Sequence, residues 1–162
     1  MTKEEYLQKL LRDWNKPKRE QTAMASKYPQ GYFTEKKCKH CGILFSPNAP
    51  SELYCSDGCK NYGVADAYYR RTYHITLEEY LDLAEKQNFV CAICGEENFA
   101  MGVNHTGCLV VDHSHETGKV RGLLCHNCNR ALGLLKDDSS LVSKAFHYLQ
   151  SVTTIPKGST LK

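Results

Sequence analysis

Apolar residues at the start of the chain recur with helical spacing. Thr2 and Glu5 have the spacing of a capping box, and the apolar residues after them lie on one helical face as far as Trp14. This pattern predicts a first helix of about three turns. Pro17 should end it, and the segment that follows, rich in lysine and arginine and without periodicity, is predicted to be a linker.

Two further helical segments precede the middle of the chain. Positions 60–73 contain alanine, valine and paired tyrosines and arginines, and they predict a connecting helix. Thr76 and Glu79 then form a second capping box. The helix that follows should turn one apolar face inward, formed by Leu77, Tyr80, Leu81 and Ala84.

The pattern then changes to two short strands. Positions 109–113 and 120–125 are apolar runs on either side of a turn at Gly118, which predicts a hairpin. Lys119 and Arg121 alternate with an apolar residue, so both are expected to face out of the hairpin, toward solvent or a phosphate.

Helical character returns after the hairpin. Positions 126–135 predict one helix, and a last amphipathic helix should begin with Ser139 or Ser140 as its cap. A frayed tail is expected from Thr153. Together the elements predict a small α+β protein.

Length and composition are those of a globular protein. The chain has 162 residues, of which 41% are hydrophobic and 24% charged. It has no apolar run of membrane-spanning length and its amino terminus lacks a secretory signal, so we expect a cytoplasmic protein with no membrane partner. Positions 1–40 are the basic end, with lysine and arginine well in excess of acidic residues.

Eight of the nine cysteines fall into close pairs, which a reducing compartment favours as metal ligands over disulfides. Two pairs together make a tetrahedral four-thiolate site, and zinc is the default metal for such a closed shell. We therefore predict two structural Zn²⁺ sites, one formed by Cys38, Cys41, Cys55 and Cys59 and the other by Cys91, Cys94, Cys125 and Cys128. The alternatives are buried unligated cysteines and iron–sulfur ligation.

Three further histidine or cysteine residues near these sites are not expected to bind metal. His40 lies inside the first cysteine pair, but a complete cysteine set makes a ligand role unnecessary. Cys108 and His105 lie in a loop, where partly buried side chains are favoured over ligands.

The two zinc ions, each with four thiolates, would change the formal net charge from +3 to about −1. The overall charge therefore does not indicate whether the protein binds nucleic acid.

Polar residues of three types cluster around the second predicted zinc site. Asp112 and Asn129 offer hard oxygen ligands for Mg²⁺ or Mn²⁺. His113 can accept the proton of an attacking water, since an imidazole ordinarily titrates near neutrality. A carboxylate, an imidazole and an amide held together are what a one-metal phosphodiesterase needs. The alternative is that these residues serve only the core and the hairpin turn.

The stretch VVDHSHETGKVRGLLCHNCNRALGLLKD, with the preceding CAIC, resembles the phage recombination endonuclease VII family of His-Me finger nucleases. The resemblance covers about residues 75–150. It implies a treble-clef-like ββα-metal fold and a catalytic cation on Asp112 and Asn129. It further implies His113 as general base, with His115 assisting at the phosphate or metal. The products implied are 5′-phosphate and 3′-hydroxyl ends.

One position departs from the family pattern. Leu132 stands where the founding resolvase has an acidic residue, which leaves open whether branched DNA, as opposed to ordinary duplex, is the substrate. A phage nuclease would act in the bacterial host cell. The rivals to a nuclease are a non-catalytic zinc-finger DNA-binding regulatory protein and a protein-interaction adaptor.

The predicted organisation has five parts. They are an amino-terminal helix and basic linker (1–37), a four-cysteine zinc finger (38–60), connecting helices (61–88), a His-Me finger endonuclease domain (89–152) and a tail (153–162). The finger, together with the linker and with Arg70 and Arg71, should widen the DNA footprint, unless the arginines are merely a solvated face. The first helix could pack on its own domain or form a homodimer.

Overall fold

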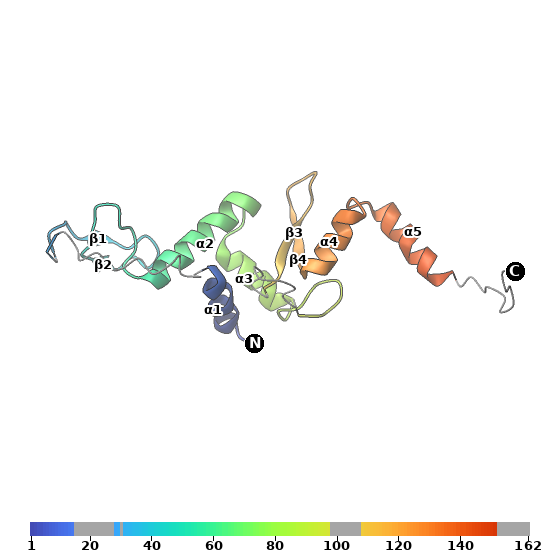
Figure 1. The fold of residues 1–162 in the computed structure, drawn as a ribbon, viewed down its shortest axis with the longest axis horizontal. Helices are drawn as coiled ribbons and strands as arrows, with labels where there is room; N and C mark the ends of the chain where they lie inside the picture. Colours follow the sequence, from blue (N-terminus) through green and yellow to red (C-terminus); the bar gives the residue numbers. More distant parts are fainter. Residues whose placement is uncertain (15–27, 30, 98–107, 152–162) are drawn as a thin grey trace, which may run out of the picture.

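A computed structural model describes residues 1–14, 28–29, 31–97 and 108–151 of the chain. The fold is α+β and elongated, with β1 and β2 at one end, α5 at the other, and α1 beside α2 and α3 in the middle (Figure 1). In chain order they are α1 (Lys3–Trp14), β1 (Lys36–Lys37), β2 (Leu44–Phe45), α2 (Asp57–Tyr73), α3 (Leu77–Lys86), β3 (Val110–His113), β4 (Val120–Leu124), α4 (His126–Leu134) and α5 (Ser139–Gln150). Most of the linker after Pro17, His105 and the tail from Thr153 lie outside the described residues.

The core lies where α1, α2 and α3 meet the β3–β4 hairpin. Tyr6 and Leu10 of α1 are buried there, so the apolar face of the first helix packs on its own chain. The hydroxyl of Tyr80 donates to the carbonyl of Leu109 at 2.8 Å, and the amide of Leu109 donates to the hydroxyl of Tyr6 at 2.7 Å. Since the two tyrosine hydroxyls are 3.0 Å apart, this buried ring of hydrogen bonds ties the helices to the start of β3.

The helix starts follow the predicted caps with one exception. Both capping boxes are present, at Thr2 with Glu5 and at Thr76 with Glu79. The cap of α5 is Asp138, so the expectation of Ser139 or Ser140 was wrong. A carboxylate at this position accepts from two backbone amides and also complements the positive end of the helix, which explains why the aspartate is used.

The outer edge of β4 is covered by a side chain rather than by another strand. The amide of Gln87, the residue after α3, accepts from the backbone N–H of Leu123 at 2.9 Å. It donates to the carbonyls of Leu123 and Val90 at 2.9 and 3.0 Å. Because Leu123 is fully buried, Gln87 satisfies strand groups that water does not reach.

The first cysteine unit lies at the far end of α2 from the core (Figure 1). The first knuckle forms the turn of a hairpin, because β1 ends just before Cys38 and β2 begins after Gly42. The ring of Tyr54 lies directly over Gly63 of α2, where an added Cβ would come within 2.5 Å of the ring. This close approach fastens the unit to α2.

Among the described helices, none combines the length and the apolar character that crossing a membrane requires.

Candidate active site and zinc sites

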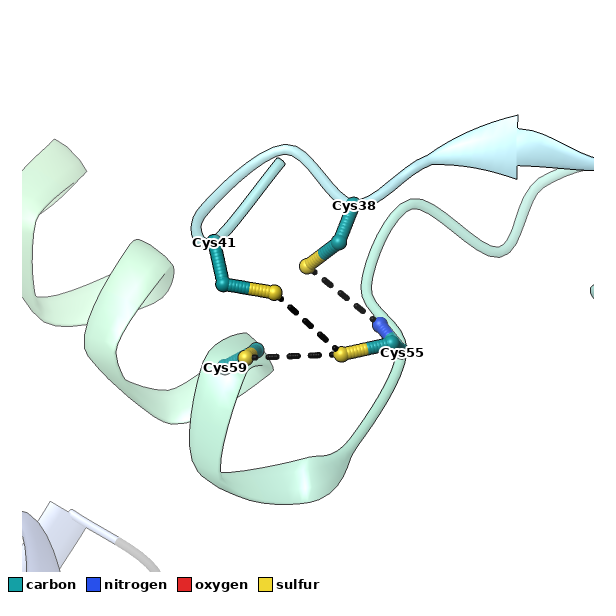
Figure 2. Close-up of side chains that lie close together, drawn as sticks. All are labelled: Cys38, Cys41, Cys55 and Cys59. Carbon is teal, nitrogen blue, oxygen red and sulfur yellow. Dashed lines mark hydrogen bonds between the residues drawn. The ribbon is translucent and has the colours of Figure 1, made fainter. Parts of the chain in front are cut away.

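The first cysteine quartet converges as its spacing predicts. The Sγ atoms of Cys38, Cys41, Cys55 and Cys59 all lie within 4.8 Å of one another. Figure 2 shows the four sulfurs turned toward a common centre, with Cys38 and Cys41 on the knuckle, Cys55 on the following loop and Cys59 on α2. The hydroxyl of Ser56 caps α2 by accepting from the amide of Cys59 and so fixes the helix turn that carries this ligand.

The second quartet has the same construction. The Sγ atoms of Cys91, Cys94, Cys125 and Cys128 also lie within 4.8 Å of one another. Cys125 is the N-cap of α4, and its sulfur accepts from the amide of Cys128. In both knuckles a glycine follows the second cysteine with positive φ, at Gly42 and Gly95, where other residues would be strained.

The ionisation of the thiols suits a divalent cation. Desolvation opposes the charged form of Cys38, but backbone N–H donors outweigh it and lower the pKa of this thiol to about 6. Backbone donors likewise lower the pKa of Cys91 to about 6 against desolvation. Hydrogen bonds to neighbouring thiols raise the pKa of Cys55 to about 12, because one thiolate disfavours the next. A zinc ion would remove this repulsion, so both quartets fit structural zinc.

Asp112 lies near the end of β3 with only 8% of its surface exposed. Arg121 binds both of its carboxylate oxygens, with Nε to Oδ2 at 2.7 Å and Nη2 to Oδ1 at 2.9 Å. The pairing register shows why: Asp112 is opposite Gly122 and His113 is opposite Val120, so Arg121 is the extra residue of a β-bulge.

Arg121 is exposed, as expected, but its pairing with Asp112 was not predicted. A bulge breaks the alternation of side chains along a strand, and the guanidinium reaches the carboxylate of Asp112. Lys119, in the turn before β4, is exposed as expected. Hydrogen bonding to Asp112 raises the pKa of Arg121 above its ordinary value, so the guanidinium stays charged.

A second carboxylate, which the sequence did not reveal, joins this pair. Asp137, in the connection from α4 to α5, accepts from Nη2 of Arg121 at 3.2 Å. Its other oxygen lies 3.2 Å from Nδ1 of His115. Lys136 and Asp137 both have positive φ, and the amide of Asp137 donates to the carbonyl of Leu132, which turns the chain back toward the hairpin.

His113 and Asn129 lie on the two elements that flank this cluster. His113 ends β3 half-buried, with its ring centroid 5.2 Å from that of His115 and 5.6 Å from that of Tyr73. Asn129 lies in the first turns of α4, which contacts β3. Within the part of the chain that the structure describes, its side-chain amide has no hydrogen-bond partner, which leaves its oxygen available as a ligand.

The surface beside Asp112 is hollowed. A hollow of about 290 Å³ is lined by Asp112, Arg121 and Leu132, with Ala92 and Ile93 of the second knuckle on its other side. Leu132 makes this wall apolar. Asp112 thus lines a recess formed by residues of the hairpin, α4 and the knuckle.

Other sequence candidates are placed elsewhere. Tyr69 is buried in the core, and Arg70 forms an ion pair with Asp66 at 2.6 Å. The ring of His40 packs on Tyr62, with centroids 4.1 Å apart. Cys108 is fully buried at the entrance to β3.

About half of the chain is similar in sequence to known proteins. The model of the recombination endonuclease VII family matches residues 66–151, just over half of the chain. The Gene 59 proteins of Mycobacterium phages D29 and L5 are each 42% identical, over 80 and 79 residues, which is 49% and 48% of this chain and 46% and 45% of theirs. The chain thus spans less than half the length of either relative.

Among solved structures, the ββα-Me type II restriction endonuclease Hpy99I aligns with 75% of this chain and 68% of its own, at 24% identity and a TM-score of 0.31. The family match covers the second half of α2, all of α3, the β3–β4 hairpin, α4 and α5. The chain therefore belongs to the recombination endonuclease VII family.

Proposed function

We propose that the protein is a metal-dependent DNA endonuclease that hydrolyses phosphodiester bonds to 5′-phosphate and 3′-hydroxyl ends. The observation that carries the proposal is the placement of Asp112 and His113 at the end of β3, which contacts the helix that carries Asn129. The second cysteine quartet joins the start of that helix to the knuckle at Cys91. Family membership supports the same reaction class.

The donor chemistry of the site fits Mg²⁺ or Mn²⁺. A carboxylate from Asp112 and an amide oxygen from Asn129 are hard ligands, and a carboxylate keeps lone pairs beyond the two that Arg121 uses. When bound, the cation would stabilise charge on the phosphate and on the leaving 3′ oxygen. Asp112 and Asn129 are the residues that would hold it.

His113 is the group that would take the proton from the attacking water. Its imidazole is half-buried at the strand end, and the rings of Tyr73 and His115 limit its orientation. Nδ1 of His115 lies 3.2 Å from Asp137, and its exposed ring would assist at the phosphate. The carboxylate clamp and the zinc knuckle together supply the rigid support that such a site requires.

The charge of the surrounding surface suits DNA. Lys119 in the hairpin turn, Arg130 on α4 and Lys136 after it all have exposed side chains. Exposed cations on one small unit attract phosphates without reading sequence. DNA is therefore the proposed partner, with duplex and branched forms to be separated by experiment.

The test compares the zinc-loaded wild type with His113→Ala on a four-way junction, a linear duplex and a supercoiled plasmid, with Mn²⁺, Mg²⁺ or EDTA. Loss of the general base should reduce cleavage by about 10²- to 10⁴-fold. Zinc content and helicity should not change. The matched control is His147→Ala on α5, an exposed histidine outside the site.

The substrate that is cleaved fastest would distinguish a junction-resolving enzyme from a nicking enzyme. Metal-dependent DNA binding without cleavage on any substrate would refute the nuclease. Metal-independent binding alone would indicate a non-catalytic zinc-finger DNA-binding regulatory protein.

A further inference from the structure

Arg121 binds both oxygens of Asp112, the carboxylate that would hold the proposed cation. Both oxygens of Asp112 accept from the guanidinium, at 2.7 and 2.9 Å, and the carboxylate is nearly buried. A guanidinium cannot lose its charge to make room for another cation. A divalent ion at Asp112 would therefore meet a permanent positive charge on the same carboxylate, and this charge has to move or be balanced.

The structure supplies a second acceptor for the same guanidinium. Nη2 of Arg121 already donates to Asp137 at 3.2 Å, and the Arg121 side chain is 40% exposed at the rim of the recess. The other oxygen of Asp137 lies 3.2 Å from Nδ1 of His115, so Asp137 also has a partner outside the pair of Asp112 and Arg121. Among the described residues, Nη1 of Arg121 has no hydrogen-bond partner, so it is available to a further anion.

We propose that Arg121 is a positioning residue that exchanges between two carboxylates. It holds Asp112 in place before the cation binds, and afterwards it is retained by Asp137, with its free N–H groups directed at the scissile phosphate. The proposal rests on the nuclease function proposed above. It assigns Asp137 to the same task, as the residue that keeps Arg121 at the rim.

The exchange makes two variants shift cation affinity in opposite directions. Arg121→Gln removes the competitor, so Mn²⁺ should bind more tightly, by about tenfold if Asp112 is free in about a tenth of wild-type molecules. Asp137→Asn removes the negative charge of the second acceptor, so Arg121 stays on Asp112 more of the time. Mn²⁺ should then bind about threefold more weakly, the effect expected for a partly exposed ion pair.

The experiment titrates the full-length, zinc-loaded protein with Mn²⁺ and measures the free ion by electron paramagnetic resonance. Removing any nearby charge changes cation binding, so each variant has a control of the same charge change. Arg130→Gln, on exposed α4 surface, is the control for Arg121→Gln. Asp138→Asn, at the adjacent position, is the control for Asp137→Asn, since asparagine also caps a helix.

A second measurement separates positioning from simple competition. At saturating Mn²⁺, Arg121→Gln should cleave DNA about 10- to 100-fold more slowly although it binds the metal better, because the phosphate has lost a charged donor. Arg121→Lys, which keeps the charge but not the paired donors, should lie between the wild type and Arg121→Gln in Mn²⁺ affinity. Zinc content and circular dichroism identify any variant that fails to fold. If Arg121→Gln does not fold, the comparison of Mn²⁺ affinity between Asp137→Asn and Asp138→Asn tests the proposal.

The outcomes separate this proposal from the one on which it rests. If the wild type binds no Mn²⁺, or if Asp112→Asn binds it as well as the wild type, the proposed nuclease site is wrong. If the wild type binds but Arg121→Gln is no tighter than Arg130→Gln, or Asp137→Asn is no weaker than Asp138→Asn, only the exchange of Arg121 is overturned.

Discussion

The Gln87 side chain links the end of α3 to the β3–β4 hairpin, and replacing it with methionine tests that link. Methionine keeps the length of the side chain but removes both hydrogen-bonding groups. The buried N–H of Leu123 would lose its acceptor at 2.9 Å, and the carbonyls of Leu123 and Val90 would each lose a donor. The carbonyl of Leu123 keeps the amide of Ala92 as a donor at 3.1 Å, so the main penalty falls on the N–H.

The magnitude follows from these contacts. One orphaned buried N–H costs about 1–3 kcal/mol, and two lost hydrogen bonds add about 1 kcal/mol each. Methionine packs well against the neighbouring apolar residues and recovers part of this, so we expect a loss of about 3 kcal/mol. For a chain of this size the melting temperature should fall by about 6–12 °C.

The assay is thermal unfolding of the zinc-loaded protein followed by circular dichroism, with cleavage measured at a temperature where both proteins are folded. Gln8→Met is the matched control, because Gln8 is exposed on α1 and the same substitution there should change stability by less than about 0.5 kcal/mol. If Gln87→Met is as stable as this control, the side chain does not satisfy the edge of β4 and the reasoning is refuted.

Two further predictions concern the first cysteine unit and the zinc sites. Gly63→Ala should displace the ring of Tyr54, since the new Cβ would lie 2.5 Å from it, and should cost about 1–3 kcal/mol and expose the unit to limited proteolysis. Zinc affinity should fall as pH falls, and more steeply below about pH 6, where Cys38 and Cys91 in the metal-free protein also become protonated. Competition with a chromophoric chelator at several pH values measures this slope.

For each of these two predictions, one result would contradict it. Gly58→Ala is the control for the first, because an added Cβ there meets only the Ser56 hydroxyl, at 3.8 Å, and equal stability of the two variants would show that Tyr54 moves without cost. A constant slope of zinc affinity through pH 6 would show that the two knuckle thiols do not ionise ahead of their neighbours.

Local features of the fold were predictable because neighbouring residues determine them. The capping boxes at Thr2 and Thr76 and the knuckles at Cys38 and Cys91 need only a fixed spacing within one turn, and the structure places all of them as expected. The cap of α5 was missed because Asp138 and the serines after it are all good caps, and spacing alone does not rank them.

The missed parts of the site depend on register and on backbone conformation. Arg121 contacts Asp112 only because a bulge adds one residue to β4, and alternation along an ideal strand predicts the opposite face. The glycine at position 122 was the available signal, since an isolated glycine within a strand often marks a bulge. Asp137 reaches the site through two successive residues with positive φ, which no sequence pattern at Lys136 and Asp137 indicates.

The position of Leu132 bears on the roles of both Arg121 and Asp137. Leu132 lies on α4 less than one turn after Asn129 and lines the recess at Asp112, so α4 contributes no acidic side chain at that point. Yet the cluster does contain a second carboxylate, because the chain leaves α4, turns back at Lys136 and brings Asp137 onto Arg121 and His115. The site thus draws its second negative charge from a loop whose amide is bonded to the carbonyl of Leu132 itself. Under the proposed exchange, Asp137 holds Arg121 while Arg121 releases Asp112. An acidic residue at position 132, on the helix beside Asn129, would not need Arg121 in order to add negative charge to the site.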